Sequence, residues 1–242
     1  MLQVLSKELN SFLNSLIAYV VIGVFLVAIG LLMWVFPETS VLDYGYADMD
    51  TLFSLGPYVF IFLVPAITMR SFAEEMKSGT MELLVTKPLT DWGIILGKYF
   101  ACFLLVLGAL LPTVVYYFSI YALGQPPGNI DTPGIIGSYV GMMLMAGVFC
   151  AVGIFASSVS RNQIVSFIVG AFTCFILFTG FESLSTLNLW SDHALFIKQL
   201  GLLDHYEALS KGLIDSRDVI YFISVIFIVL SVTKLIIGSR KW

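Results

Sequence analysis

The sequence IIGSYVGMMLMAGVFCAVGIFASSV, residues 135–159, contains no charged side chain and is long enough to cross a lipid bilayer as a helix. Apolar runs of the same kind lie on both sides of it. The six predicted spans are residues 16–36, 52–70, 99–123, 135–159, 164–181 and 219–237. Their hydrophobicity is continuous and does not alternate with a period of two, which favours helices over the strands of an outer-membrane barrel.

The composition supports the same class of protein. Of the 242 residues, 59% are hydrophobic and 12% are charged, which is more apolar than a soluble domain can bury in its core. We therefore predict one all-α polytopic membrane domain over residues 1–242. The three cysteines fall inside predicted spans without paired spacing, and they are interpreted as free buried thiols: Cys102, Cys150 and Cys174.

Basic residues predict the orientation, because lysine and arginine accumulate in cytoplasmic loops. With the N-terminus in the cytoplasm, nine of the 12 basic residues lie inside, and only Lys198, Lys211 and Arg217 lie outside. The nine are Lys7, Arg70, Lys77, Lys87, Lys98, Arg161, Lys234, Arg240 and Lys241. The loops at residues 37–50 and 124–133 are acidic and contain no basic residue, as expected of outer loops. Six spans then leave both termini in the cytoplasm.

Residues 1–15, MLQVLSKELNSFLNS, are too polar to belong to the first span. Their apolar side chains recur at helical spacing: Leu2, Leu5, Leu9, Phe12 and Leu13. This pattern predicts an amphipathic helix that lies in the membrane interface. A signal peptide is the alternative, but Lys7 and Glu8 form a weak basic region and no small-residue cleavage site follows residue 36.

A charged segment, EEMKSGTMELLVTKPLTD at residues 74–91, separates the second and third spans. Gly79 is expected to end the incoming helix in the left-handed conformation. Thr80 is expected to cap a new short helix, whose first turn contains Glu82, because a negative charge there is favoured by the helix dipole.

The same segment has a predicted apolar face and a predicted stop. Leu83 and Leu84 contribute to that face, and Pro88 ends the short helix before Thr90 and Asp91 start the next one. A small amphipathic helix in water suits docking into a groove on a soluble protein. An ordinary solvated loop, capped for stability, is the alternative interpretation.

This segment resembles the pattern EE-x-x-x-GT-x-E-x-L-x-x-x-P, which follows the second membrane helix in ABC-2 type permeases, the membrane subunits of ATP-binding cassette transporters. The residues that carry the resemblance are Glu74, Glu75, Gly79, Thr80, Glu82, Leu83, Leu84 and Pro88. The resemblance extends over nearly the whole chain. Residues 5–25 and 200–222 are more narrowly similar to the gliding-motility-associated permease subunit of that family, the GldF type.

The resemblance implies a fold and a set of partners. The fold is a permease half of the ABC-2 or type V exporter kind, with six transmembrane helices and an N-terminal interfacial helix. Residues 74–91 are implied to contact separate ABC ATPase subunits, which bind the ATP and magnesium. A second ABC-2 membrane subunit, either GldG-like or another copy of this chain, is implied in the lipid bilayer of the bacterial inner membrane. No nucleic-acid partner is expected.

The spans lack groups that other transport mechanisms need. No acidic residue or histidine lies within a predicted hydrocarbon segment, which disfavours a proton- or ion-coupled carrier. Residues 93–99 resemble a phosphate-binding loop only loosely, because three residues separate the glycines and Tyr99 replaces the magnesium-binding hydroxyl. We therefore expect a non-catalytic subunit with no cofactor or metal of its own.

Two Asp-His pairs, at residues 192–193 and 204–205, are the only candidates for metal or acid-base chemistry. Without a third ligand in view, they are interpreted as solvated loop residues. Pro65 and Pro112 predict kinks that either line a path or serve packing. Gly137-x-x-x-Gly141 permits a close helix contact, within the chain or between subunits.

Residues 182–218 are too long for a turn and too broken for a span. Two short amphipathic pieces, at residues 194–203 and 206–214, are predicted, split at residues 204–205 and closed by Gly212. By resemblance, this segment re-enters the membrane and caps the outer mouth of the pathway. The outer-gate candidates are Leu195, Leu202 and Leu209. A surface helical hairpin is the alternative.

The sequence thus favours a permease subunit that converts ATP hydrolysis by a partner into conformational change, in an exporter linked to gliding motility or to the cell envelope. The alternative is a membrane anchor or mechanotransmission subunit that carries no substrate itself.

Overall fold

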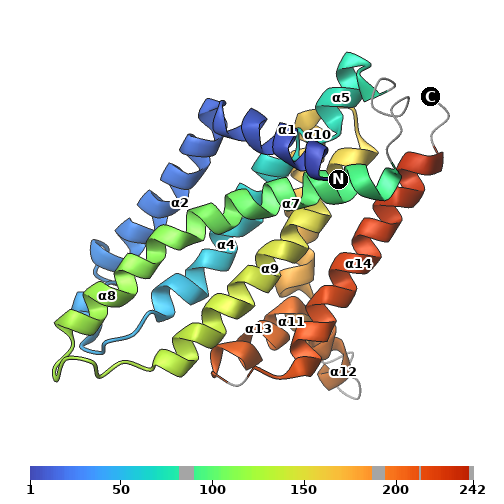
Figure 1. The fold of residues 1–242 in the computed structure, drawn as a ribbon. Helices are drawn as coiled ribbons and strands as arrows, with labels where there is room; N and C mark the ends of the chain where they lie inside the picture. Colours follow the sequence, from blue (N-terminus) through green and yellow to red (C-terminus); the bar gives the residue numbers. More distant parts are fainter. Residues whose placement is uncertain (82–89, 187–193, 213, 240–242) are drawn as a thin grey trace.

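The computed structural model describes residues 1–81, 90–186, 194–212 and 214–239, and the regular elements in these residues are helices (Figure 1). The α-helices are α1 (Leu2–Leu13), α2 (Leu16–Trp34), α3 (Val41–Tyr44), α4 (Asp50–Thr68), α5 (Ala73–Ser78), α7 (Asp91–Leu110), α8 (Val114–Leu123), α9 (Thr132–Val159), α10 (Gln163–Phe175), α11 (Phe181–Ser185), α12 (Ala194–Gln199), α13 (Leu202–Ser210) and α14 (Ser216–Ser239). A 3-10 turn, Leu111–Thr113, joins α7 to α8, and a π-helical turn, Ile176–Gly180, joins α10 to α11. The predicted all-α fold is confirmed.

Five helical segments are each long and apolar enough to cross a membrane: Asp50–Ser78, Asp91–Leu123, Thr132–Val159, Gln163–Ser185 and Ser216–Ser239. The remaining predicted span, residues 16–36, corresponds to α2, which meets the same test of length and hydropathy only together with α1, as a pair bent by 67°. Its 19 residues extend over about 28 Å at 1.5 Å per residue, close to the thickness of the hydrocarbon core.

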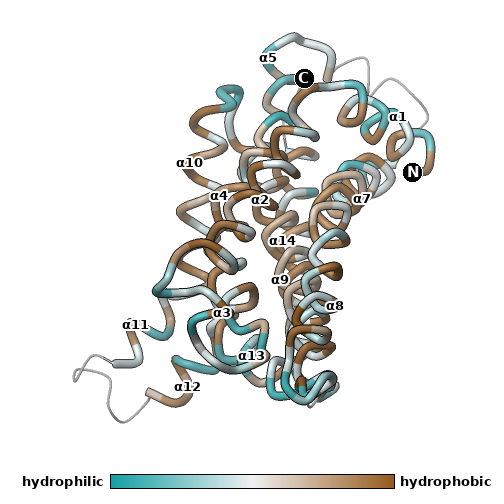
Figure 2. The backbone as a smooth tube through the Cα atoms, turned by 90° about the vertical axis from the view of Figure 1, so that its left-hand side faces the viewer, coloured by the Kyte–Doolittle hydropathy of each residue, from teal (hydrophilic) through white to brown (hydrophobic). Residues whose placement is uncertain are grey.

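The two ends of the bundle are built from different elements. At one end lie α1, α5, the start of α7, the turn between α9 and α10, and the end of α14; we call this the α5 end (Figure 1). At the other end lie α3, the connection from α8 to α9, and α11 to α13; we call this the α13 end. Hydrophilic residues gather toward both ends, and hydrophobic residues dominate the length between them (Figure 2).

The central helix of the bundle is α9, which packs against α4, α7, α10, α13 and α14. In its most apolar window 78% of the residues are buried, compared with 28% for the segment that contains α10 and 22% for α14. These two peripheral helices therefore leave most of their apolar surface outside the chain.

The two prolines at which kinks were predicted, Pro112 and Pro65, lie in different surroundings. Pro112 lies in the 3-10 turn between α7 and α8, where the hydroxyl of Thr113 donates a hydrogen bond to the carbonyl of Leu110 at 2.6 Å. This bond supplies a donor to the carbonyl of Leu110, which lies next to the break between the two α-helices. Pro65 is buried in α4 and faces Gly170 of α10, so this proline lies at a packing contact between helices.

The face of α1 differs from the prediction. Val4 and Phe12 are buried against the bundle, whereas Leu2 is 75% exposed and Leu13 is 52% exposed. The predicted apolar face is therefore divided between the protein and its surroundings. The reason is that α1 lies across α7 at Gly97, where the absent side chain lets Val4 approach closely.

The close contact predicted from Gly137-x-x-x-Gly141 is an intrachain contact. A Cβ atom added at Gly137 would collide with the carbonyl oxygen of Leu209, and one added at Gly141 would lie 2.9 Å from the ring of Tyr206. Both neighbours belong to α13. The two glycines therefore let α13 pack directly on the first turns of α9.

This contact predicts the effect of a single added methyl group. We expect Gly137→Ala to lower the unfolding free energy by about 1–3 kcal/mol, because a backbone carbonyl of α13 has to move. Gly108→Ala in α7 is the matched control: no atom lies within 4 Å of its added Cβ, and alanine favours a helix by up to about 1 kcal/mol. Thermal unfolding of both variants in detergent measures the difference, and equal melting temperatures would contradict the contact.

Candidate functional site

The connection after the second span begins with α5, whose first turn contains Glu74 and Glu75. The helix ends at Gly79, with φ of +73°, the left-handed conformation predicted for this glycine. The hydroxyl of Thr80 lies 2.9 Å from that of Ser78 and donates to the carbonyl of Glu75 at 3.5 Å. Thr80 therefore folds back onto the end of α5.

Residues 82–89 lie outside the described part of the chain, so the predicted short helix with Glu82, Leu83, Leu84 and Pro88 stays a prediction. The description resumes at Thr90, whose hydroxyl accepts a hydrogen bond from the N–H of Gly93 at 3.2 Å. This cap confirms the predicted helix start at Thr90 and Asp91. The helix thus begins eight residues before the apolar run 99–123, and these first turns contain Lys98.

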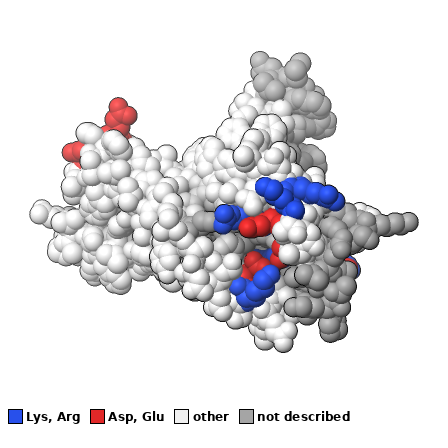
Figure 3. Space-filling model, turned by 90° about the horizontal axis from the view of Figure 1, so that it is seen from above, with Lys and Arg blue, Asp and Glu red and all other residues white. Residues whose placement is uncertain are grey.

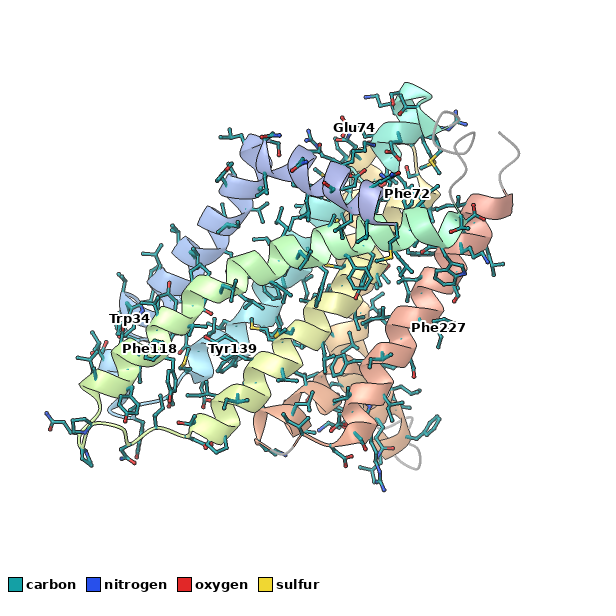
Figure 4. All side chains as sticks on the ribbon, viewed as in Figure 1. Trp34, Phe72, Glu74, Phe118, Tyr139 and Phe227 are labelled. Atoms are coloured by element: carbon teal, nitrogen blue, oxygen red, sulfur yellow. The ribbon has the colours of Figure 1, made fainter. Side chains whose placement is uncertain are left out.

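The ammonium group of Lys98 joins three segments: α1, α5 and the turn between α4 and α5. Lys98 is 1% exposed, and its Nζ lies 2.9 Å from Oε1 of Glu75 in α5 and 3.0 Å from Oε1 of Glu8 in α1. It also donates to the carbonyl of Ser71 at 2.7 Å and lies 5.1 Å from the ring centroid of Phe72. Figure 4 shows Phe72 at this junction. The ammonium therefore donates hydrogen bonds to Glu8 and Ser71 and forms an ion pair with Glu75.

Lys7 extends the network toward solvent. Its Nζ lies 3.2 Å from Oε1 of Glu75 and 3.5 Å from Oε1 of Glu8. Partial burial by itself would lower the pKa of Lys7, but the negative charges of Glu75 and Glu8 outweigh it, so the pKa is raised. Two ammonium groups therefore neutralise two carboxylates where α1, α5 and α7 meet.

Ser157, near the end of α9, fixes the break between α4 and α5. Its hydroxyl oxygen accepts hydrogen bonds from the backbone N–H groups of Phe72 at 2.9 Å and Ala73 at 3.1 Å, and it donates to the carbonyl of Met69 at 3.0 Å. One side chain thus satisfies backbone groups that the ends of two helices leave unpaired. The central helix is thereby tied to α5.

The structure brings together residues that the sequence analysis had separated. Glu75 was predicted at a partner contact, whereas its side chain is 13% exposed and binds Lys98 inside this chain. The roles of Glu8, Lys98 and Ser157 were missed. A single lysine in the otherwise apolar start of a membrane helix was a usable signal, because a buried charge requires partners.

The segment at the α13 end is built differently from the prediction. The break between its two short helices lies at Leu200–Gly201, and Asp204 and His205 lie inside α13. Gly212, with φ of +80°, closes the segment as predicted. The hydroxyl of Tyr206 donates to the carbonyl of Phe53 at 2.7 Å, which joins α13 to the start of α4. Glycine permits the break at residue 201, whereas the Asp-His pair is compatible with helix.

The three outer-gate candidates have different environments. Leu202 and Leu209 are 1% and 0% exposed, inside the packing of α13. Leu195, in α12, is 79% exposed. Their predicted role as a gate stays a prediction. The buried positions, Leu202 and Leu209, require a different experiment from the exposed position, Leu195.

His205 is not the solvated loop residue that we predicted. Its Nδ1 lies 2.6 Å from Oδ1 of Asp218, its Nε2 lies 2.9 Å from the carbonyl oxygen of Gln199, and its ring stacks on Tyr221 at 3.9 Å. Asp204 instead pairs with Lys198, and this hydrogen bond and charge raise the pKa of the lysine. Among the described residues, no group of three or more potential ligands could hold a metal ion. Residues 192–193 lie outside the described part.

Removal of the Ser157 hydroxyl tests its contact with α5. We expect Ser157→Ala to lower the unfolding free energy by about 1–3 kcal/mol, because two buried N–H groups lose their acceptor. Ser224→Ala in α14 is the control, since Ser224 is exposed and its hydroxyl donates only to the preceding turn of its own helix. Thermal unfolding and hydrogen exchange at α5 measure both variants. Unchanged exchange in Ser157→Ala would contradict the contact.

Comparison with known proteins identifies the family. A search of curated proteins found no significantly similar relative. The family model described as ABC-2 family transporter protein matches residues 37–200, which is more than half of the chain and includes the connection from α4 to α7. The helical fold and the candidate spans agree with that match. This chain therefore belongs to the ABC-2 family of transporter membrane proteins.

Proposed function

We propose that this chain is the permease subunit through which separate ABC ATPase subunits drive a conformational change in the membrane. The contact of Lys98 with Glu8, Glu75 and Ser71 is the observation that carries the proposal. An ATPase that moved the residues after α5 would pull on this buried ion pair. The cost of separating such a pair is several kcal/mol, so the connected helices move together with α5.

The connections of α5 define which helices respond. Lys98 links α5 to α7 and α1, and Ser157 links the start of α5 to α9. A displacement of α5 would thereby reach the second, third and fourth spans as a rigid-body movement. The residues proposed to contact or position the ATPase are Glu74, Glu75, Gly79, Thr80, Glu82, Leu83, Leu84 and Pro88. Glu75 would act by holding α5 in position, since its side chain is engaged with Lys98 and Lys7.

The remaining partners follow from the family and from the surface. The proposed orientation places the α5 end in the cytoplasm of a bacterial cell, where ATP is available. A second ABC-2 membrane subunit, GldG-like or another copy of this chain, would complete the pathway. The apolar surface that α10 leaves uncovered is compatible with such a neighbour or with lipid. The export of a substrate linked to gliding motility or to the cell envelope is part of the proposal.

Two left-handed glycines allow a matched test of coupling. Gly79 and Gly45 have φ of +73° and +71°, and no atom lies within 4 Å of a Cβ added to either. Valine at either position therefore introduces a similar local strain, of about 1–2 kcal/mol. Gly79 lies at the α5 end and Gly45 at the α13 end. We expect Gly79→Val to reduce transport-coupled ATP hydrolysis of the assembled complex and Gly45→Val to leave it unchanged.

The assay compares ATPase activity and ATPase co-purification of the two variants in the same membranes. Equal activity of both variants at equal expression would contradict a coupling role for α5. A complex that hydrolyses ATP normally but moves no cargo would instead favour the mechanotransmission subunit.

The proposed re-entrant segment is tested at its exposed position. In a background without Cys102, Cys150 and Cys174, we expect a cysteine at Leu195 to react slowly with a membrane-impermeant maleimide, because lipid prevents thiol ionisation. A cysteine at Asp43, exposed on α3, should react rapidly. Leu209→Cys supplies the rate of a thiol buried by protein. Labelling of position 195 as fast as position 43 would indicate a surface hairpin.

A further inference from the structure

His205, in α13, has a hydrogen-bond acceptor at each of its two ring nitrogens. Nδ1 lies 2.6 Å from Oδ1 of Asp218, and Nε2 lies 2.9 Å from the carbonyl oxygen of Gln199. An ionised carboxylate and a backbone carbonyl only accept hydrogen bonds, whereas a neutral imidazole has a single N–H. Two short contacts require two hydrogens. The pair of His205 and Asp218 therefore holds one proton more than a neutral imidazole and an ionised carboxylate hold together.

The surroundings of the ring suit this additional proton. The side chains of His205 and Asp218 are 18% and 13% exposed, so the carboxylate is largely withdrawn from water. An imidazolium beside it compensates a charge that would otherwise be buried alone. The ring of Tyr221 stacks on that of His205, with centroids 3.9 Å apart, and the face of an aromatic ring attracts a cation. A protonated pair thus fits the carboxylate, the carbonyl and the aromatic face together.

Asp218 is the charged group that contacts this ring among the described residues. Lys198 is engaged with Asp204 at 3.3 Å, and Glu207 and Glu182 act on the same lysine. The central helix α9, which also packs against α13, contains no charged residue. The other charged residues of the elements around α13 at this end are Asp50 of α4, Glu182 of α11, Lys198 of α12, Asp204 and Glu207 of α13 itself, Lys211 and Asp215 of the connection to α14, and Arg217 of α14.

Loss of the proton removes one of the two bonds of the ring. If the remaining hydrogen stays between Nδ1 and Asp218, the lone pair of Nε2 faces the carbonyl oxygen of Gln199, and two acceptors do not form a hydrogen bond. Gln199 is the last residue of α12. The next carbonyl, that of Leu200, accepts a hydrogen bond from the hydroxyl of Tyr221 at 2.6 Å, and this bond does not involve the histidine. The release is therefore confined to α12, with a pivot at Leu200–Gly201.

We propose that His205 and Asp218 form a pH-sensitive switch, which holds the end of α12 against α13 and α14 when the pair is protonated and releases it when the proton is lost. Histidine side chains titrate between about pH 5 and about pH 8, so the switch responds to moderate changes of pH. It lies at the α13 end (Figure 1), opposite the charged side chains that Figure 3 shows over the α5 end. The proposal is independent of ATPase coupling, because it concerns contacts within the α13 end alone.

Electron-spin distance measurements on the full chain in lipid test the switch. Spin labels are attached at two exposed positions, Leu195→Cys in α12 and Ser216→Cys in α14, in a background without Cys102, Cys150 and Cys174. We expect one narrow distance distribution at about pH 5 and a broader one at about pH 8, because the end of α12 loses its bond to the ring. Equal distributions at both pH values would overturn the proposal.

Three variants assign the change to this pair. His205→Ala removes the titrating ring and should give the broad distribution at both pH values. Asp218→Asn should give the narrow distribution at both, because its amide donates to Nδ1 of a neutral ring and leaves the ring hydrogen on Nε2 for the carbonyl of Gln199. This opposite effect keeps the test decisive if His205→Ala does not fold.

The control is His193→Gln, which removes the other histidine of the chain and should keep the pH dependence of the unaltered protein. A pH dependence that persisted in folded His205→Ala or in Asp218→Asn would overturn the assignment, as would one that disappeared in His193→Gln.

Discussion

A buried charge needs compensation, and this requirement organises the α5 end of the molecule. Lys98 lies in a helix that crosses the membrane, so its ammonium group has to find acceptors within the protein. It finds them in Glu8 of α1, Glu75 of α5 and the carbonyl of Ser71. These contacts fix α1, the connection after α4 and the start of α7 relative to one another. The side chain of Lys98 therefore holds α5, the start of the candidate coupling segment, against α1 and α7.

Small residues along α9 organise the rest of the bundle. Apolar burial drives little helix association inside a membrane, so close van der Waals packing and interhelical hydrogen bonds supply much of the stability. Gly137 and Gly141 contact α13. Farther along α9, Gly147 contacts Tyr99 of α7 and Gly153 contacts Thr68 of α4. Ser157 continues this row at the α5 end through hydrogen bonds to the break between α4 and α5. One helix thus contacts both the α13 segment and the α5 connection.

The α13 end has its own polar attachments. His205 lies between Asp218 and the carbonyl of Gln199, and Tyr206 is bonded to the carbonyl of Phe53. These contacts join α12, α13, α14 and α4, which are separated in the sequence. Asp204 and His205, which the sequence offered as candidates for metal or acid-base chemistry, thus contribute to the packing of this segment. They have different partners, Lys198 and Asp218.

The sequence by itself determined the class of protein, because the apolar runs at residues 16–36, 52–70, 99–123, 135–159, 164–181 and 219–237 are long enough to cross a bilayer, and their continuous hydrophobicity favours helices over barrel strands. Local chemistry also determined Gly79 as a helix end and Thr90 as a helix start, since both depend on neighbouring backbone atoms. Only the tertiary structure decided the partners of Lys98, the role of Ser157 and the buried face of α1. These contacts join residues as many as 90 positions apart, and helical periodicity specifies which face of a helix is apolar but not which distant side chain meets it.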